Sequence, residues 1–150
     1  MNRLTTALLA VLVAVGALAG LPGCAAPGAA TAAEARTKPG VVVQISDADP
    51  RTWTQALNVV RNIQSEYGMD KVDIEVVVFG NGIGLLQKNS PQASRIAETL
   101  VSGAAVTMCE NTMAGRKVTR ADMLPDIGYV KAGVVEIIEK QKQGWAVVRP

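Results

Sequence analysis

Cys109 is the residue of this 150-residue sequence best placed to do chemistry. The chain has two cysteines and no histidine, which excludes histidine-based acid–base catalysis, Cys–His nucleophile pairs and His-ligated zinc. Cys109 follows an apolar run and precedes a segment able to start a helix. Helix N–H groups and the charge of Arg116 favour a thiolate there, while Glu110 opposes it. We predict that Cys109 takes part in chemistry through its thiol. The alternative is that it is a small residue of the core.

A glycine-rich loop at residues 80–84 is the second candidate. Position 85 is Leu, where a dinucleotide-binding motif needs its third glycine, and no Lys followed by Ser or Thr completes a P-loop. Two interpretations remain for the loop. It is either a turn that uses the positive φ open to glycine, or a wall of a small-anion site built by Asn81 and Gly82.

Metal and nucleic-acid binding have little support in the sequence. Met108 and Met113 lie close to Cys109 and suggest a Cu(I) site, but methionines at helical spacing are more often core residues. Fifteen basic and 13 acidic residues give a net charge of +2, which is too even for a basic nucleic-acid surface. We expect no metal, no cofactor and no nucleic-acid partner. Three scattered carboxylates show no metal-binding motif and are expected on a solvated surface: Asp122, Asp126 and Glu136.

The N-terminal segment is predicted to be an export signal. Arg3 precedes an uncharged stretch whose apolar run, residues 7–19, is shorter than the roughly 20 residues that span a bilayer. Residues 21–24 resemble a lipobox, which predicts cleavage after a signal peptide of residues 1–23 and acylation of Cys24. The alternative is an ordinary signal peptide cleaved between residues 30 and 35, which removes Cys24. Either way we expect an exported, periplasmic protein. If Cys24 is acylated, that N-terminal lipid anchors the protein to the membrane.

The elements that must position Cys109 follow from hydrophobic periodicity. Residues 24–40 read as a flexible tether, and residues 41–150 as one folded domain that opens with a buried strand at 41–45. Asp49 and Pro50 then supply an N-cap and a first helical residue, and Gly68 ends the helix. Its apolar residues recur at three- and four-residue intervals and predict one face packed on a sheet: Trp53, Ala56, Leu57, Val60, Ile63 and Tyr67.

Strands and helices are predicted to alternate through the rest of the chain. Strands are expected at residues 72–79, 104–108 and 145–148, and helices at 91–102, 110–116 and 132–143, with a capping box formed by Thr119 and Asp122. The 91–102 helix is expected to turn four side chains inward, Ile96, Ala97, Leu100 and Val101, and the 132–143 helix carries apolar Val134, Val135, Ile137 and Ile138.

This alternation predicts an α/β fold with three layers, α/β/α, around a mostly parallel sheet of four or five strands. Such sheets bind ligands beyond the carboxyl ends of their strands, where the glycine loop and Cys109 both fall.

The order of elements, the run from Cys109 to Met113 and the block from Ala132 to Trp145 resemble the DsrE/DsrF-like family, in its exported single-domain branch. The resemblance covers residues 41–150. It implies a DsrE/YchN-like fold, assembly into a homo-oligomer that is a trimer or hexamer, and a sulfur-bearing cysteine at the position of Cys109. Arg116 corresponds to a basic position in the helix after that cysteine.

Two functions are compatible with these residues. In the first, Cys109 accepts sulfur from a sulfane-sulfur donor, holds it as a persulfide and passes it to a thiol partner. Asn81, Gly82, Asn111 and Arg116 are then the predicted substrate-binding residues, and the protein is a sulfur carrier or a sulfurtransferase. In the second, the chain is a non-catalytic oligomeric module of the cell envelope that binds a small anion or a protein.

Overall fold

The computed structural model describes residues 38–150. The predicted signal peptide, Cys24 and most of the predicted tether lie outside these residues. Among the described residues no helix is long and apolar enough to cross a bilayer. The elements, with η marking 3-10 helices, are β1 (Gly40–Ile45), α1 (Pro50–Tyr67), η1 (Met69–Lys71), β2 (Asp73–Val78), η2 (Gly80–Leu86), α2 (Ala93–Val101), β3 (Ala105–Cys109), α3 (Glu110–Arg116), η3 (Arg120–Asp122), β4 (Gly128–Val130), α4 (Gly133–Lys142) and β5 (Ala146–Val148).

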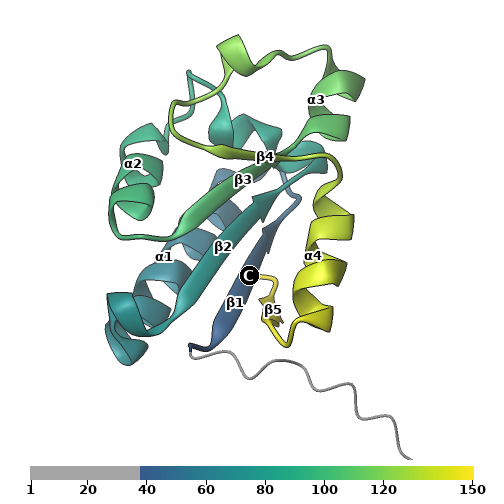
Figure 1. Ribbon diagram of the computed structural model, residues 1–150. Helices are drawn as coiled ribbons and strands as arrows, with labels where there is room; N and C mark the ends of the chain where they lie inside the picture. Colours follow the sequence, from purple (N-terminus) through teal and green to yellow (C-terminus); the bar gives the residue numbers. More distant parts are fainter. Residues whose placement is uncertain (1–37) are drawn as a thin grey trace, which may run out of the picture. The chain divides into compact units, whose positions relative to one another are not determined.

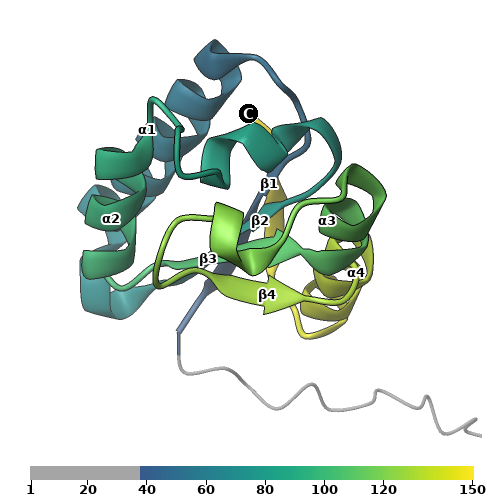
Figure 2. The same ribbon diagram turned by 90° about the horizontal axis from the view of Figure 1, so that it is seen from above.

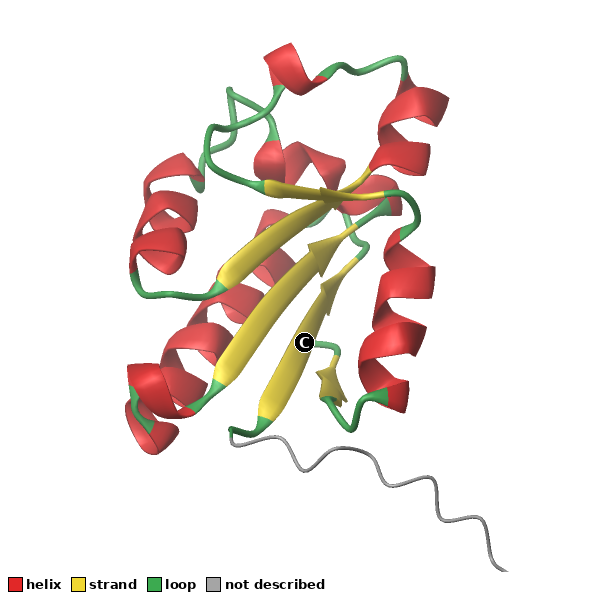
Figure 3. Ribbon diagram, viewed as in Figure 1, coloured by secondary structure: helices red, strands yellow, loops and turns green. Residues whose placement is uncertain are grey.

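The five strands form one parallel sheet in the order β4-β3-β2-β1-β5, with helices on both faces (Figures 1 and 3). Parallel neighbours require a crossover, and the helices provide it. The predicted α/β fold with a mostly parallel sheet is therefore confirmed, with five strands. Because all strands point the same way, their carboxyl ends share one edge, and η2, α3 and the start of α4 gather there (Figure 2).

Local signals explain where α1 begins and ends. The Asp49 side chain accepts a hydrogen bond from the Arg51 N–H at 2.9 Å, and Pro50 occupies the first helical position, where no N–H is needed. Gly68 closes the helix at a φ of 92°, in the region that favours glycine. The predicted boundaries of this helix are thus confirmed.

The core is unequal on the two faces of the sheet. Alternate residues of β1 and β2, such as Val43 and Val76, enter a large cluster with α1 and α2. On the other face, a small cluster contains three buried residues: Val42 and Val77 from the sheet, and Ile137 from α4. Burial on both faces explains why the central strands are apolar almost throughout.

An ion pair between a buried carboxylate and a partly buried lysine supplements the small cluster and holds α4 on the sheet. The Lys140 ammonium of α4 lies 2.8 Å from the Glu75 carboxylate of β2, and the Thr107 hydroxyl donates to the same carboxylate at 2.7 Å. Lys140 also lies 4.4 Å from the ring centroid of Trp145. If Lys140 moved away, the buried Glu75 carboxylate would lose its partner charge, which is costly. These contacts therefore fix the position of α4 along β2 and β3.

Several predicted details are wrong. The helix predicted at residues 91–102 has Ile96 buried but turns Ala97 and Val101 outward, with Val101 89% exposed. Thr99 takes the inward place, because its hydroxyl donates to the Arg95 carbonyl at 2.8 Å and is satisfied while buried. In α1, Tyr67 lies 58% exposed at the end of the helix, where the sheet no longer covers it.

Two further elements differ from the prediction. The residues predicted as a loop at 80–84 form the 3-10 helix η2, which packs over the end of β1. The edge strand β4 was not predicted, because its three residues include a glycine and form no apolar run. On α4, Ile137 is buried, whereas Val134, Val135 and Ile138 are 52%, 54% and 44% exposed.

Gly82 provides a test of how closely η2 packs on the sheet. A Cβ at this position would lie 2.8 Å from the Ile45 carbonyl oxygen, which is backbone and cannot rotate away. We expect Gly82→Ala to lower the free energy of unfolding by about 1–3 kcal/mol, measured by urea denaturation. Gly115→Ala is the matched control, since a Cβ there meets nothing within 4 Å. It is expected to be neutral or stabilising by about 0.5–1 kcal/mol. Equal effects at both sites would contradict the packing described for η2.

Candidate site at Cys109

Cys109 lies where three elements meet at the carboxyl edge of the sheet. It is the last residue of β3, where it pairs with Val130 of β4, and it is the N-cap of α3. Its backbone is extended, with φ −74° and ψ 115°, so the chain turns sharply from strand to helix at this residue. The residue is buried, at 5% exposure, and is the free cysteine of the described chain.

The surroundings of Cys109 favour its thiolate. Burial on its own raises the pKa of the Cys109 thiol. Hydrogen bonds from the Thr112 hydroxyl and from the backbone N–H groups of Gly133, Thr112 and Asn111 lower it, and together they outweigh burial. The net pKa therefore lies below the ordinary value for cysteine. Donors from the starts of both α3 and α4 contribute, which extends the predicted effect of the α3 N-terminus to a second element.

Thr112 is a member of this group that the sequence analysis did not single out. Its hydroxyl oxygen accepts a hydrogen bond from the Gly80 N–H at 2.9 Å, which leaves its proton for the Cys109 sulfur. The hydroxyl thus links the first residue of η2 to the thiol. The sequence signal for it was positional: Thr112 is the third residue of the helix that begins directly after Cys109, within one turn of the thiol.

Gly133 brings the start of α4 against Cys109. A Cβ at Gly133 would lie 3.1 Å from the Phe79 Cβ and 3.3 Å from the Cys109 Cβ, both tighter than ordinary contacts. The absence of a side chain lets the backbone N–H of Gly133 reach the sulfur. Sequence analysis placed the start of this helix at residue 132 but gave no sign that it returns to Cys109.

Glu110, the charge expected to oppose a thiolate, is engaged elsewhere. Its carboxylate forms an ion pair with Arg120 at 2.5 Å, and the Arg120 guanidinium lies 4.2 Å from the ring centroid of Tyr129. This pair keeps the acidic group of α3 directed toward η3 and β4. The negative charge next to Cys109 is therefore partly neutralised.

The structure separates the predicted substrate-binding residues into two groups. Arg116 lies at the far end of α3, about 9 Å along the helix axis from its start. Its guanidinium donates to the side-chain oxygen of Asn81, so these two predicted residues contact each other. Gly82 is buried and its N–H donates to the Phe79 carbonyl at 3.1 Å.

Asn111 belongs to the group around the thiol. Its side chain is exposed, and its backbone N–H contributes to the lowered pKa of Cys109 while also donating to the Lys131 carbonyl at 3.1 Å. That second bond ties the first turn of α3 to the segment between β4 and α4. The backbone of Asn111 thus has a structural role as well as a place beside the sulfur.

Methionines near Cys109 lie in the core. Met108 is fully buried and Met113 is 5% exposed, and both belong to the large apolar cluster. Within residues 38–150, no group of three or more His, Cys, Asp or Glu side chains is arranged to hold a metal ion.

Comparison with known proteins now identifies the family. The model of the DsrE/DsrF-like family matches residues 29–150, which is most of the chain. The chain belongs to the DsrE/DsrF-like family. A search of curated proteins finds no match.

Solved structures share the fold of this DsrE-like protein. The protein of unknown function MTH1491 from Methanobacterium thermoautotrophicum is 28% identical, with a TM-score of 0.72, and the match covers 75% of this chain and 100% of that one. The ychN protein from E. coli is 11% identical, with a TM-score of 0.61, over 77% of this chain and 100% of that one. The second likeness concerns the fold alone.

Thr112 allows the origin of the lowered thiol pKa to be tested. In a Cys24→Ala background, the rate of Cys109 alkylation by iodoacetamide should reach its plateau at a lower pH than for an ordinary cysteine. Thr112→Val removes the hydroxyl donor, so the pKa of Cys109 should rise and the whole rate profile should move to higher pH. Thr112→Ser keeps the hydroxyl and should retain the original profile. Identical profiles for the Val and Ser variants would show that the hydroxyl does not stabilise the thiolate.

Proposed function

We propose that this DsrE-like protein carries sulfur as a persulfide on Cys109. The observation that supports the proposal most is the convergence of donors on one thiol, from the Thr112 hydroxyl and the Gly133 N–H, which lowers its pKa. A thiolate is the nucleophilic form of cysteine, and the same donors suit a persulfide anion. Family membership agrees with this role, because the sequence resemblance assigns sulfur carriage to the cysteine at this strand end.

The proposed reaction is a transfer of one sulfane sulfur atom. The Cys109 thiolate attacks the outer sulfur of thiosulfate, a persulfide or a polysulfide, and a new S–S bond forms as the donor S–S bond breaks. The bonding pair leaves with the departing group, which is sulfite in the case of thiosulfate. An acceptor thiolate then attacks the outer sulfur of the persulfide, which returns Cys109 to its thiolate form. No external oxidant or reductant is required.

The burial of Cys109 restricts the donor. Because only 5% of Cys109 is exposed, a small, unbranched donor would reach its sulfur more easily than a bulky one. We therefore favour small inorganic donors for loading. Arg116, exposed at the far end of α3, contacts exposed Asn81 near the start of η2, and its guanidinium would attract an approaching anion.

Exposed apolar residues on α4 support a proposal about assembly. Val134, Val135 and Ile138 form an exposed apolar stripe on α4, since residues three and four apart lie on one side of a helix. We propose that this stripe joins copies of the chain into a trimer or hexamer, the assembly implied by the family resemblance. If Cys109 takes up no sulfur, the chain is instead a non-catalytic oligomeric binding module.

The proposed location is the cell envelope, in the exported single-domain branch of the family. Its support is the sequence before residue 38: an uncharged apolar segment followed by Cys24 in a lipobox-like context. Acylation of Cys24 would anchor the domain to a membrane through residues 25–40. Periplasmic sulfane-sulfur compounds would then be the available donors.

Sulfur loading can be measured by intact-mass spectrometry. In a Cys24→Ala background, incubation with thiosulfate or polysulfide should add the mass of one sulfur atom, and dithiothreitol should remove it. Cys109→Ser should gain nothing, while Thr112→Val should load more slowly because less of its thiol is ionised at neutral pH. No mass gain with any donor, or an equal gain in Cys109→Ser, would contradict the proposal.

The assembly can be tested separately by light scattering. The wild-type chain should have the mass of a trimer or hexamer at micromolar concentration. Ile138→Glu places a charge in the exposed α4 stripe and should shift the protein to monomer, because burying an unpaired charge is costly. Val101→Glu is the matched control, since Val101 is 89% exposed on α2, away from that stripe. A monomeric wild-type protein would contradict the proposed assembly.

A further inference from the structure

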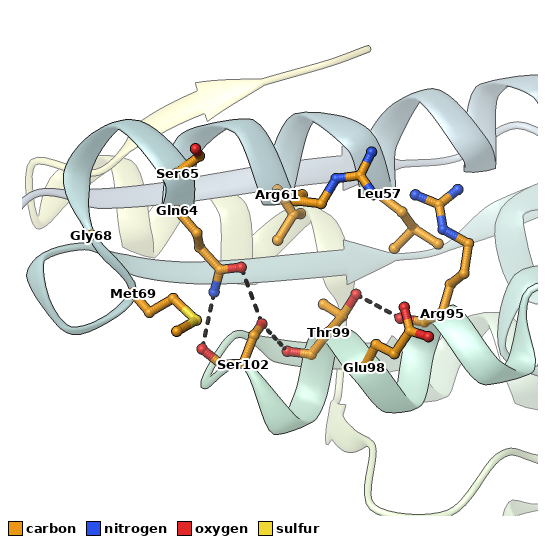
Figure 4. A pocket seen from close by; sticks show the side chains of 11 residues that line it. Leu57, Arg61, Gln64, Ser65, Gly68, Met69, Arg95, Glu98, Thr99 and Ser102 are labelled. Atoms are coloured by element: carbon orange, nitrogen blue, oxygen red, sulfur yellow. Dashed lines mark hydrogen bonds between the residues drawn. The ribbon is translucent and has the colours of Figure 1, made fainter.

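A groove with a volume of about 510 Å³ lies between α1 and α2, apart from the Cys109 site (Figure 4). Its lining comes from the second half of α1, the turn after it, and α2. None of the lining residues belongs to the group around Cys109. This volume lies within the range of roughly 300–1,000 Å³ typical of small-molecule sites.

Hydrogen bonds between the two helices hold the groove at both ends. At one end, Arg95 of α2 donates to the Asn58 side-chain oxygen at 2.9 Å and to the Thr54 carbonyl at 3.5 Å. At the other end, the Gln64 amide donates to the Ser102 carbonyl, and the Ser102 hydroxyl donates back to Gln64, both at 3.1 Å. The width of the groove is thus fixed before any ligand binds, which lowers the entropic cost of binding.

Two arginines concentrate positive charge at the first end of the groove. Arg61 donates to Asn58 at 3.3 Å, so it shares a single neutral acceptor oxygen with Arg95. Among residues 38–150, neither guanidinium lies within ion-pair distance of a carboxylate. Glu98 also lines the groove, one turn along α2 from Arg95, so two positive charges face one negative charge. Paired guanidinium groups with unused N–H donors match the geometry of a carboxylate or a phosphate.

The floor between the two ends is apolar. Leu57 and Val60 of α1 lie at its base and belong to the core, and at 3% and 1% exposure they leave little of their own surface open to a ligand. Figure 4 shows Met69 near the Gln64–Ser102 end, opposite the two arginines, and its side chain is largely exposed. A molecule lying in the groove would contact charge at one end and hydrocarbon along its length.

We propose that this groove binds a small amphiphilic anion, with its carboxylate or phosphate head at Arg61 and Arg95 and its apolar body extending over Leu57 and Val60 to the exposed Met69. The proposal is independent of sulfur carriage at Cys109. The two arginines lie on different helices, so their spacing in the sequence gave no indication of the pairing.

The proposal is tested by NMR titration of the ¹⁵N-labelled full chain with octanoate. Saturable shifts should appear in the amides of residues 57–69 and 95–102, with few elsewhere. Octanol, which has the same chain without the charge, should bind roughly tenfold more weakly, as expected for loss of a charged hydrogen bond. Octyl phosphate should bind at the same amides, and its affinity relative to octanoate identifies the preferred head group.

Three variants distinguish the loss of a charge that binds the ligand from damage to the fold. Arg61→Gln should weaken octanoate binding roughly tenfold, and it leaves the Arg95 and Gln64 bonds between the helices in place. Glu98→Gln should strengthen binding roughly twofold, since it removes the one opposing charge. Arg51→Gln, at the start of α1 outside the groove, should change nothing. Equal binding of octanol and octanoate, no effect of Arg61→Gln, or shifts that do not saturate would overturn the proposal.

Discussion

The approach of α4 to Cys109 is the contact on which the proposed site depends. The Gly133 N–H reaches the sulfur because no side chain separates the two backbones, and a Cβ there would crowd both Phe79 and Cys109. A helix held by so few buried apolar residues needs another anchor. The ion pair between Lys140 and Glu75 provides it, two turns further along the same helix. The packing of α4 on one face of the sheet thereby brings the Gly133 N–H to the Cys109 sulfur and contributes to the lowered pKa of the thiol.

Competition between burial and hydrogen bonding decides the state of the thiol. A cysteine that is 5% exposed in an apolar setting would be expected to stay protonated. Here the hydrogen bonds from the Thr112 hydroxyl and from the backbone N–H groups around it outweigh burial and lower the pKa of the Cys109 thiol. In the proposed sulfur carriage, a covered sulfur with a lowered pKa would accept sulfur from small donors and exclude larger ones.

Sequence reasoning predicted the features that have local causes. The start of α1 at Asp49 and Pro50, the strand that ends at Cys109 and the short helix after it all follow from neighbouring residues. Features with distant causes could not be obtained in this way. Gly133 reaches Cys109 across 24 positions of sequence, and the packing of α2 buries Thr99 and exposes Val101, which the spacing of its apolar residues did not indicate. The packing of elements that are distant in sequence and the hydrogen bonding of buried side chains, rather than apolar periodicity, determine which residues are buried at those positions.

The account is tested most directly by a crystal structure of the protein after loading with polysulfide. The extra sulfur should be bonded to the Cys109 Sγ, with the Thr112 hydroxyl or the Gly133 N–H within hydrogen-bond distance of the sulfur pair. Thr112 should still accept from the Gly80 N–H, since that bond orients its proton toward the sulfur. An unmodified Cys109 in crystals of protein that has gained sulfur, or an added sulfur that meets none of these donors, would contradict the account.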